Sequence, residues 1–532
     1  MTEPARAWAG ESYDAPMSRP SIVAFAALVA STALLAGCGG HQLSTSSAAR
    51  SATTNDTPAA SPTATASRAA VSDGDWRTFD YNAQRTGVGP AATGIAAGNL
   101  GLLRRRVVHV DGTVDSSAIQ LHAVRVGGRI RDVIVVTTTY GKTIAIDPGT
   151  GARLWEFTPS DIGNYVGSSQ VTTATPVADP DRRYVYAASP DGVIHKLAVA
   201  SGREVRSGGW PVRITFDPTH EKIAAALNIS GSSVVAVTGG YYGDAPPYQG
   251  HVVLIDRTTG RITHVWNSLC SNRQYLIDPP SSCPASDSAI WGRAGAVIER
   301  GSGRILVATG NGPFNGATDW GDSVLELSPD ASRLLHNWTP VDQAQLNAND
   351  EDVGSTAPVL LPETRGRRLA VQGGKDGELA LLDLDRLDGT TQGAGPRTGG
   401  QLPQISAPGG DQVFTAPAVA TLRGRPYVFV ADNSGTTAYV LGPGNRLSVA
   451  WQDGTGATSP VLAGGLLYVY DQQGGRLLIR PPASGQVLRS FPAGNGHWNS
   501  PIVVGGRIIL PQGNYMDHAT SGVIDIYNLP GR

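Results

Sequence analysis

The sequence has 532 residues, of which 42 are Lys or Arg and 44 are Asp or Glu, so its formal net charge is −2. Charged residues make up only 16% of the chain, and this balance gives no electrostatic reason to expect nucleic acid or an anionic membrane surface as a partner. The 66 glycines and 36 prolines favour many short strands joined by turns over long helices.

The N-terminus carries an export signal. Arg19 precedes an uncharged apolar run, residues 21–36, which is too short for a membrane span and typical of a secretory signal. The run ends in Leu-Ala-Gly before Cys38, which resembles the lipobox of bacterial lipoproteins, whose cysteine is diacylated and becomes the mature N-terminus. The alternative is an ordinary signal peptide with a chance cysteine. The acidic stretch before Met17 fits a signal poorly, which favours Met17 as the start.

We therefore expect residues 1–38 to be a lipoprotein signal peptide, with the mature protein held at the membrane of the cell envelope by lipid on Cys38. Residues 39–74 are mostly Ser, Thr, Ala and Pro, with little to bury, and indicate a disordered tether. The folded part is then expected over residues 75–532.

One sequence unit recurs along the folded part: a small residue and Pro before an apolar strand, a turn, a second strand and a Thr-Gly or Ser-Gly turn. Five clear copies open at Thr175, Ala357, Ala416, Ser459 and Ser500, and three weaker ones begin near Ser116, Ser232 and Ala294. Eight copies spaced by about 40 to 70 residues are typical of propellers and solenoids. We predict an all-β fold, an eight-bladed β-propeller of four-stranded antiparallel blades. A β-solenoid, whose repeats are shorter and more uniform, is the alternative.

Hairpins with an Asp before Thr-Gly accompany tryptophans at regular places in the repeats. These tryptophans are Trp155, Trp266, Trp338 and Trp451, the first two preceded by Asp147 and Asp256. The Asp caps the turn, and we interpret the Trp as a structural residue that docks between neighbouring blades. The opening segment, residues 75–80, is expected to pack back on the body or to help close the ring.

Two cysteines remain once Cys38 is lipidated, namely Cys270 and Cys283. In an oxidising compartment such a pair is most simply a disulfide, here closing a short surface loop over residues 271–282. A zinc site is excluded because the pair lacks the further ligands that zinc needs.

The tryptophan hairpins resemble the docking repeats of the pyrroloquinoline quinone (PQQ) propellers. That family includes quinoprotein alcohol and glucose dehydrogenases, and non-enzymatic relatives such as the lipoprotein of the β-barrel assembly machine. The resemblance extends from about residue 75 to the C-terminus. It implies the fold, but enzymes and scaffolds share the repeat, so it does not choose a function.

The middle blades resemble the quinoprotein dehydrogenases more specifically. Trp291, in Trp-Gly-Arg, stands where those enzymes place the Trp on which PQQ stacks. Asn311 lies in a Thr-Gly-Asn-Gly-Pro segment like the one whose Asn ligates calcium. Asp352 begins a stretch like that of the catalytic aspartate, and Lys375 falls where a basic residue contacts the quinone. A Gly-Asp-Ser run at residues 321–323 also matches.

The chemistry implied by this resemblance suits the residue types. An indole supplies an aromatic floor for a planar quinone, and calcium takes oxygen ligands such as an Asn carbonyl. Asp352 would take the alcohol proton as general base, and Lys375 would stabilise charge that develops on the quinone oxygens. The resemblance thus implies PQQ and calcium as cofactors.

Three features depart from the family. Ser168 and Ser169 stand where alcohol dehydrogenases have adjacent cysteines covering the other face of the cofactor, so the resemblance puts these serines beside PQQ. The glutamate that ligates calcium should follow Gly-Gly at residues 239–240, but the next carboxylate is Asp244, which can substitute only if the loop shifts. The chain also lacks a haem-binding Cys-x-x-Cys-His, so electrons would have to leave to a separate acceptor.

Each site residue also has a purely structural interpretation. Trp291 can plug the channel, Asn311 and Lys375 can belong to ordinary turns, and Asp352 can belong to a solvated charged loop. His195, His251, His497 and His518 have no metal-ligand spacing and are interpreted as structural or surface residues.

Two functions from different classes follow. The first is a quinoprotein-like oxidoreductase that oxidises an alcohol or a sugar. The second is a lipid-anchored scaffold or binding propeller with an envelope protein as its partner, favoured by the missing glutamate and the missing cysteine pair. A hydrolase has little support, since no nucleophile motif stands out.

Overall fold

The structure is a computed structural model that describes residues 74–241, 245–363, 366–387, 396, 399–514, 516 and 521–531. The chain divides into two units, Met1–Ser67 and Arg68–Arg532, and all of the described residues lie in the second. Cys38 and the expected tether fall outside the described residues, so the signal, the tether and the domain boundaries remain predictions. None of the described helices is long and apolar enough to cross a membrane.

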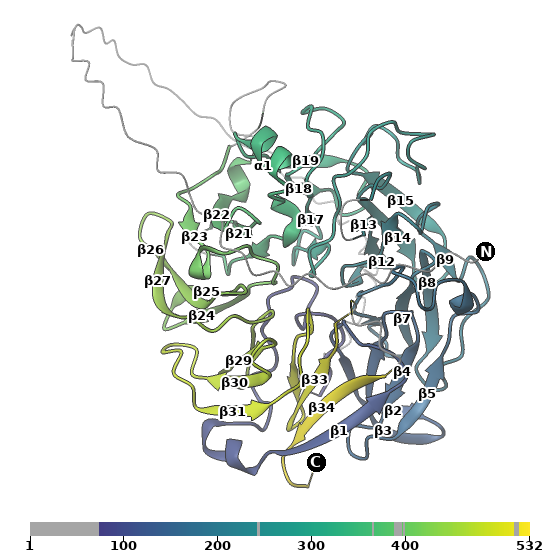
Figure 1. Ribbon diagram of the computed structural model, residues 1–532, viewed down its shortest axis with the longest axis vertical. Helices are drawn as coiled ribbons and strands as arrows, with labels where there is room; N and C mark the ends of the chain where they lie inside the picture. Colours follow the sequence, from purple (N-terminus) through teal and green to yellow (C-terminus); the bar gives the residue numbers. More distant parts are fainter. Residues whose placement is uncertain are drawn as a thin grey trace, which may run out of the picture. The chain divides into compact units, whose positions relative to one another are not determined.

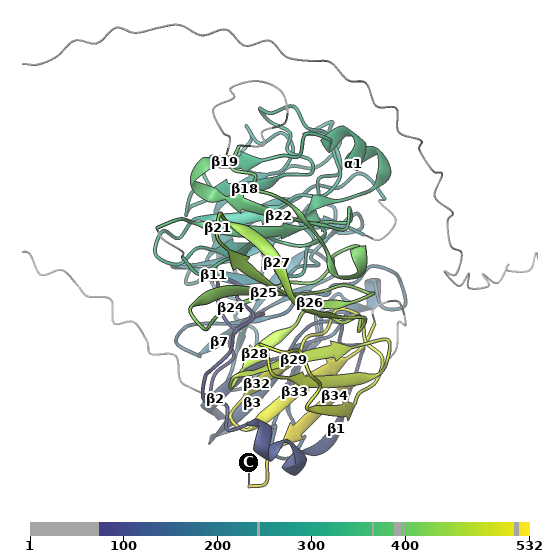
Figure 2. The same ribbon diagram turned by 90° about the vertical axis from the view of Figure 1, so that its left-hand side faces the viewer.

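The described residues form eight four-stranded antiparallel sheets, the blades of a β-propeller, and this confirms the predicted fold (Figure 1). Figure 2 shows blades 5, 6 and 7 from the side, one after another. The second and third strands of a blade are almost wholly buried, as in β29 and β30 of blade 7, because each blade packs between two others.

The strands of the first four blades have the following bounds. Blade 1 contains β2 (Ile119–Val126), β3 (Arg129–Thr137), β4 (Thr143–Ile146) and β5 (Arg153–Phe157). Blade 2 contains β6 (Val177–Ala178), β7 (Tyr184–Ser189), β8 (Val193–Ala198) and β9 (Val212–Arg213). Blade 3 contains β11 (Asn228–Ser230), β12 (Ser233–Val237), β14 (His251–Asp256) and β15 (Ile262–Asn267). Blade 4 contains β16 (Val297–Ile298), β17 (Ile305–Ala308), β18 (Val324–Leu327) and β19 (Leu334–Trp338).

The last four blades follow the same plan. Blade 5 contains β20 (Val359–Leu360), β21 (Leu369–Gly373), β22 (Glu378–Asp383) and β23 (Ile405–Ser406). Blade 6 contains β24 (Ala418–Leu422), β25 (Arg425–Ala431), β26 (Thr436–Gly442) and β27 (Arg446–Asp453). Blade 7 contains β28 (Val461–Ala463), β29 (Leu466–Asp471), β30 (Arg476–Arg480) and β31 (Arg489–Pro492). Blade 8 contains β32 (Ile502–Val504), β33 (Arg507–Gln512), β34 (Gly522–Asn528) and β1 (Arg104–Val110).

A small two-stranded sheet and a few short helices complete the described structure. The sheet pairs β10 (Glu221–Lys222) with β13 (Gly239–Gly240). The α-helix is α1 (Gln343–Asn349), and the 3₁₀ helices are η1 (Ala97–Leu102), η2 (Ile162–Asn164), η3 (Val353–Ser355), η4 (Leu384–Arg386) and η5 (Pro408–Gly410).

The ring is closed by a strand from the N-terminal side of the fold. β1 pairs antiparallel with β34 over seven residues, from Arg104↔Asn528 to Val110↔Gly522, and so becomes the outermost strand of blade 8. The last three strands of the chain therefore share a sheet with its first strand. Because the two ends of the ring are joined by backbone hydrogen bonds, the last blade is held beside the first.

The segment before β1 runs across the inner strands, and we call residues 76–93 the strap. Its backbone exchanges hydrogen bonds with inner-strand or adjoining residues of six blades, namely Gln120, Ala178, Ile298, Val419, Leu462 and Gly506. In Figure 1 this part of the chain passes through the middle of the ring. Trp76 and Phe79, each 1% exposed, pack on the body, as expected for residues 75–80.

Arg85 fastens the strap to blades 3 and 4. Its guanidinium donates to the carbonyl oxygens of Leu227 (2.8 Å), Ala226 (3.3 Å) and Ala294 (3.0 Å), and within the strap to Thr78 and Phe79. The side chain is buried, so these carbonyl groups have little access to water.

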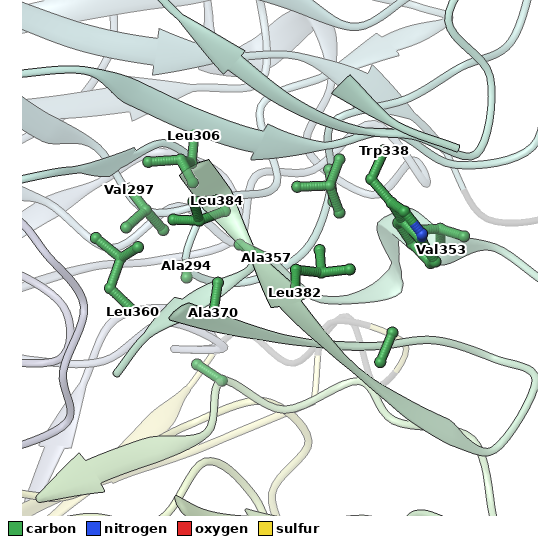
Figure 3. Close-up of a cluster of buried hydrophobic side chains, with 14 of the residues drawn as sticks. Ala294, Val297, Leu306, Trp338, Val353, Ala357, Leu360, Ala370, Leu382 and Leu384 are labelled. Carbon is green, nitrogen blue, oxygen red and sulfur yellow. The ribbon is translucent and has the colours of Figure 1, made fainter. Parts of the chain in front are cut away.

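Apolar side chains fill the space between neighbouring blades, and the cluster between blades 4 and 5 bears on the site (Figure 3). It contains Val297, Leu306 and Trp338 of blade 4 and Leu360, Ala370 and Leu382 of blade 5. Val353 belongs to the same cluster and is 5% exposed. Because Val353 follows Asp352 directly, its burial fixes the backbone that carries the Asp352 carboxylate.

The tryptophans dock between blades, as interpreted from the sequence. The indole N–H of Trp155 in blade 1 donates to the carbonyl oxygen of Val199 in blade 2 (2.8 Å). The indole N–H of Trp451 in blade 6 donates in the same way to Pro482 in blade 7 (2.8 Å). The predicted disulfide between Cys270 and Cys283 is also confirmed.

Replacing Arg85 tests the importance of the strap. Arg85→Met should lower the free energy of unfolding by about 3 kcal/mol or more, because buried carbonyl groups lose their donors. The measurement is the urea midpoint of the full chain. Arg489→Met is the matched control, since Arg489 is exposed and its guanidinium lies over the ring of Phe491, on blade 7. Equal midpoints for the two variants would show that the strap is not held by Arg85.

Candidate functional site

Four predicted site residues lie on loops of blades 4 and 5. Trp291 precedes β16 and Asp352 precedes β20, the inner strands, while Asn311 follows β17 and Lys375 follows β21, the next strands outward. Since the inner strand and its neighbour are antiparallel, the start of one and the end of the other lie at the same end of the blade. The fold therefore brings these four residues together at one end of the ring, which we call the channel mouth.

Asp352 is the centre of the cluster, with only 2% of its surface exposed. Its Oδ1 accepts a hydrogen bond from the backbone N–H of Asn311, and its Oδ2 lies 2.5 Å from the ammonium nitrogen of Lys375. The backbone N–H of Lys375 also donates to the Asp352 carbonyl oxygen (3.0 Å). The carboxylate is thus oriented by two loops at once.

Burial and neighbouring charges set the protonation of this pair. Loss of hydration raises the pKa of Asp352 to about 6, although the Lys375 ammonium and the Asn311 N–H act in the opposite direction. Burial works against the charge on Lys375 as well, but the attraction of Asp352 and Asp350 outweighs it and raises the pKa of the ammonium. Lys375 Nζ lies 2.7 Å from the more exposed Asp350.

Trp291 forms the aromatic part of the site and is only partly buried. The ammonium nitrogen of Lys375 lies 5.4 Å from its ring centroid, within the range of a cation–π contact. Its ring stacks with Trp498 at 5.8 Å and 23°, and lies 5.9 Å from Phe414. Gly310 makes this approach possible, because a Cβ there would lie 2.2 Å from Asp352 Oδ1 and 3.1 Å from Trp291 Nε1.

Asp322 belongs to the Gly-Asp-Ser run that resembles the quinoprotein dehydrogenases. It lies near Asp352 and is fully buried. Its Oδ1 accepts from the backbone N–H of Val353 (3.2 Å), and its Oδ2 is 3.4 Å from the amide nitrogen of Gln343 on α1. Burial, together with the nearby Asp352 charge, raises the pKa of Asp322 to about 8. Asp322 therefore supports the loop that carries Asp352.

Sequence reasoning missed a second set of residues, which joins blades 8, 1 and 4 at the site. His497 stacks on Trp498 at 4.6 Å and its Nδ1 lies 2.8 Å from Asp115 Oδ2. Arg293 is buried and donates to the carbonyl oxygens of Asp115 (3.0 Å) and Trp498 (2.7 Å). Its guanidinium lies 5.2 Å from the Trp498 ring centroid. Arg293 thereby holds Trp498 against Trp291.

A positional signal could have found Trp498. It lies two residues before the opener at Ser500, as Asp352 lies five residues before the opener at Ala357, so both lie where the chain enters an inner strand. His497, interpreted from the sequence as structural or at the surface, instead lies at the site and is partly buried.

Ser168 and Ser169, the predicted cover of the cofactor, are both exposed. Ser168 makes local hydrogen bonds, donating from its hydroxyl to the carbonyl oxygen of Tyr165 (2.7 Å) and accepting from Tyr140 at its own carbonyl (2.9 Å). Within the described residues, no hydrogen bond or ring contact joins either serine to Trp291, and their place on the other face of PQQ stays a prediction.

The calcium site can be assessed only in part. Asp244, one of its two predicted ligands, lies outside the described residues. Among the residues that are described, no group of three or more His, Cys, Asp or Glu side chains could hold a metal ion. Both oxygens of Asp352 are already engaged, by Asn311 and by Lys375. Calcium therefore remains a prediction.

Comparison with known proteins confirms the resemblance to PQQ-repeat propellers. Residues 109–269 match the family model described as outer membrane protein assembly factor BamB. The fold is similar to quinohemoprotein alcohol dehydrogenase from Comamonas testosteroni, with a TM-score of 0.61, 16% identity, and coverage of 88% of this chain and 82% of that one. It is also similar to a europium-containing methanol dehydrogenase, with a TM-score of 0.62, 15% identity, and coverage of 86% and 98%.

A third similar structure is a quinohemoprotein alcohol dehydrogenase from Pseudomonas putida HK5, with a TM-score of 0.62, 14% identity, and coverage of 86% of this chain and 81% of that one. No curated protein matches the sequence. At these identities the structural likeness establishes the fold, and the function has to be argued from the site.

Removing the Lys375 ammonium should make stability more dependent on pH. Because the folded pKa of Asp352, about 6, lies above its usual value of 3.8, the folded state holds this proton more tightly, and stability falls as pH rises from about 4 to about 6. Lys375→Met should raise the pKa of Asp352 further, so that the stability of the folded protein keeps falling as the pH rises above 6.

The measurement is the urea midpoint of wild type and Lys375→Met at several pH values between about 5 and 8. The destabilisation caused by the substitution should grow with pH. Lys142→Met is the matched control, since Lys142 pairs with Asp111 and Glu156 rather than with Asp352, and its effect should be nearly constant. A constant difference for Lys375→Met would contradict the assigned pairing.

Proposed function

We propose that this propeller is a quinoprotein-like oxidoreductase that binds PQQ at the channel mouth and oxidises an alcohol or a sugar. The observation that carries the proposal is the convergence of Trp291, Asp352 and Lys375. A propeller does not need a buried carboxylate, an ammonium and a partly exposed indole at one point in order to fold. The similar dehydrogenase structures are consistent with it.

The cluster fits a planar, acidic quinone. The partly exposed Trp291 ring offers a stacking surface, and the Lys375 ammonium, 5.4 Å from that ring, offers a positive charge for quinone or carboxylate oxygens. Trp498 and Phe414 would border the bound ring. When bound, PQQ would supply a two-electron acceptor.

The protein's own groups have separate tasks in this proposal. Asp352, with a pKa of about 6, is mostly ionised at neutral pH and can take the hydroxyl proton of a substrate as general base. Lys375 and the Asn311 N–H hold its carboxylate in place. Oxidation of an alcohol to a carbonyl compound releases two electrons and two protons, which bound PQQ would accept and would pass to a separate acceptor.

The second candidate is a binding propeller with an envelope protein partner. The observation that favours it is that Asp352 and Lys375 already satisfy each other, while the described residues include no cluster of three metal ligands. The match of residues 109–269 to the BamB family model is in keeping with it. This candidate predicts a partner recovered from envelope extracts and no affinity for PQQ.

Calorimetric titration of PQQ into the full chain, with calcium present and absent, separates the two candidates. The proposal predicts micromolar or tighter binding that weakens at least tenfold in Trp291→Ala, because the stacking surface is lost. Phe216→Ala is the matched control, since Phe216 is an exposed aromatic residue, 57% exposed, on the β9–β10 connection. Absence of binding to wild type would reject the oxidoreductase in favour of the binding propeller.

Loss of the proposed base should abolish turnover without abolishing cofactor binding. With PQQ and calcium supplied, dye reduction by alcohols or sugars should fall at least a hundredfold in Asp352→Asn. Asp111→Asn is the control, because Asp111 also pairs with a lysine, Lys142, and neither residue is assigned to the site. Equal rates in Asp352→Asn and wild type would remove Asp352 from its assigned role.

We also propose that the protein is exported and anchored to the cell envelope by lipid on Cys38. The support is the sequence from Arg19 to Cys38, which has the pattern of a lipoprotein signal. Intact-mass analysis of envelope-extracted protein should show cleavage before Cys38 and a diacylglyceryl-sized increment. Cys38→Ser should yield protein without that increment, and its absence from wild type would refute the anchor.

A further inference from the structure

The loop that presents Asn311 to Asp352 connects β17 with β18, and we call residues 309–323 the site hairpin. The Asn311 N–H reaches Asp352 Oδ1 from this hairpin, and Asp322 at its other end supports Val353. The position of the site hairpin therefore decides how the Asp352 carboxylate is held.

The loop closed by Cys270 and Cys283 has two arms, residues 270–271 and residues 283–288. The first arm holds the middle of the site hairpin. The Cys270 backbone N–H donates to Asp319 Oδ1 (2.9 Å), and the Ser271 N–H donates to the Thr318 carbonyl oxygen (2.9 Å). The indole N–H of Trp320 donates to the Ser271 hydroxyl (2.9 Å). Three hydrogen bonds thus join residues 270–271 to residues 318–320.

The other arm holds the start of the site hairpin. Cys283 is fully buried, and the chain continues from it to Ser288, whose backbone N–H donates to the Asn311 carbonyl oxygen (2.6 Å). The Ser288 hydroxyl also donates to the Trp320 carbonyl oxygen (3.2 Å). Asp287 and Ser288 have φ values of 85° and 59°, a region that side-chain-bearing residues rarely adopt unless their surroundings hold them there.

The disulfide is the covalent link between these two arms, and the Ser268 hydroxyl adds a hydrogen bond to the Ser288 carbonyl oxygen (2.7 Å). The apolar cluster under this loop has only three buried members, Leu269, Ile277 and Cys283 itself. With so small a core, the covalent bond is one restraint on the distance between the arms, beside the hydrogen bonds that join Asp287 to Tyr248 and Ala285 to Gln249.

We propose that the Cys270–Cys283 disulfide is a positioning element of the site: it holds the site hairpin from both sides, so that Asn311 meets Asp352, and its reduction loosens the site. The consequence for the cofactor rests on the proposed function, whereas the consequence for the hairpin does not. Reduction by an added dithiol transfers two electrons and two protons, giving two cysteine thiols while the reagent forms its own disulfide.

Hydrogen exchange followed by mass spectrometry tests the proposal on the full chain. In reduced wild type and in the double variant Cys270→Ser/Cys283→Ser, amides of residues 284–288 and 309–322 should exchange at least tenfold faster than in oxidised wild type. The β26–β27 turn, residues 443–445, lies on blade 6 and serves as the internal control, with unchanged exchange. Reoxidation should restore protection in wild type and not in the double variant.

A second variant keeps the disulfide and removes one of its contacts. Asp319→Ala deletes the carboxylate that accepts from the Cys270 N–H and should accelerate exchange in the site hairpin alone, by a smaller factor. PQQ titration gives the functional readout, with at least a tenfold rise in Kd expected on reduction. Unchanged hairpin exchange in the double variant would overturn the proposal. Faster exchange in a protein that binds no PQQ even when oxidised would uphold the positioning role and reject the proposed function.

Discussion

Closure of the ring by β1 is the constraint on which the rest of the structure depends. Each blade covers its apolar faces with its two neighbours, so the packing is complete only if blade 8 is fixed beside blade 1. Seven residues of β1, paired with β34, provide that link in backbone hydrogen bonds. The strap then contacts one inner strand after another, and Arg85 fastens it to blades 3 and 4.

The channel mouth inherits its geometry from this closed ring. Trp498 comes from blade 8, Asp115 from the entry to blade 1, Arg293 and Trp291 from the entry to blade 4, and Asp352 from the entry to blade 5. Contacts between them cross from one blade to another, as in the hydrogen bonds from Arg293 to Asp115 and Trp498. The cluster can therefore exist only when the blades stand in their native order around the axis.

Burying a charged carboxylate costs free energy, because the charge loses its hydration. The contacts of Asp352 offset only part of that cost. Lys375 and the Asn311 N–H stabilise its charge, yet burial still leaves its pKa at about 6. If this position served folding alone, an apolar side chain would make the folded protein at least as stable, since buried ion pairs often add nothing to stability. Retention of the pair beside a partly exposed indole is thus better explained by a ligand or a reaction than by folding.

The blade count could be predicted from the sequence, because five inner strands are preceded by a clear opener and the weaker copies keep a similar spacing, although the copy near Ser232 lies just after the inner strand β11. The closing strand could not, since β1 has no opener and pairs with residues more than 400 positions away. The family resemblance predicted that Trp291, Asn311, Asp352 and Lys375 lie together, because it aligned the local segments that contain them. Ser168 and Ser169 were assigned by the same alignment; both are exposed, and their place beside PQQ stays a prediction. The contributions of Trp498 and Arg293 depend on contacts between distant blades, which no local pattern encodes.

The most direct measurement of the central claim is a crystal structure of the folded chain grown with PQQ and calcium. The account predicts a planar group stacked on Trp291 and in contact with the Lys375 ammonium, with Asp352 facing it. An unchanged channel mouth, with Lys375 still closed on Asp352 and no planar group on Trp291, would contradict it.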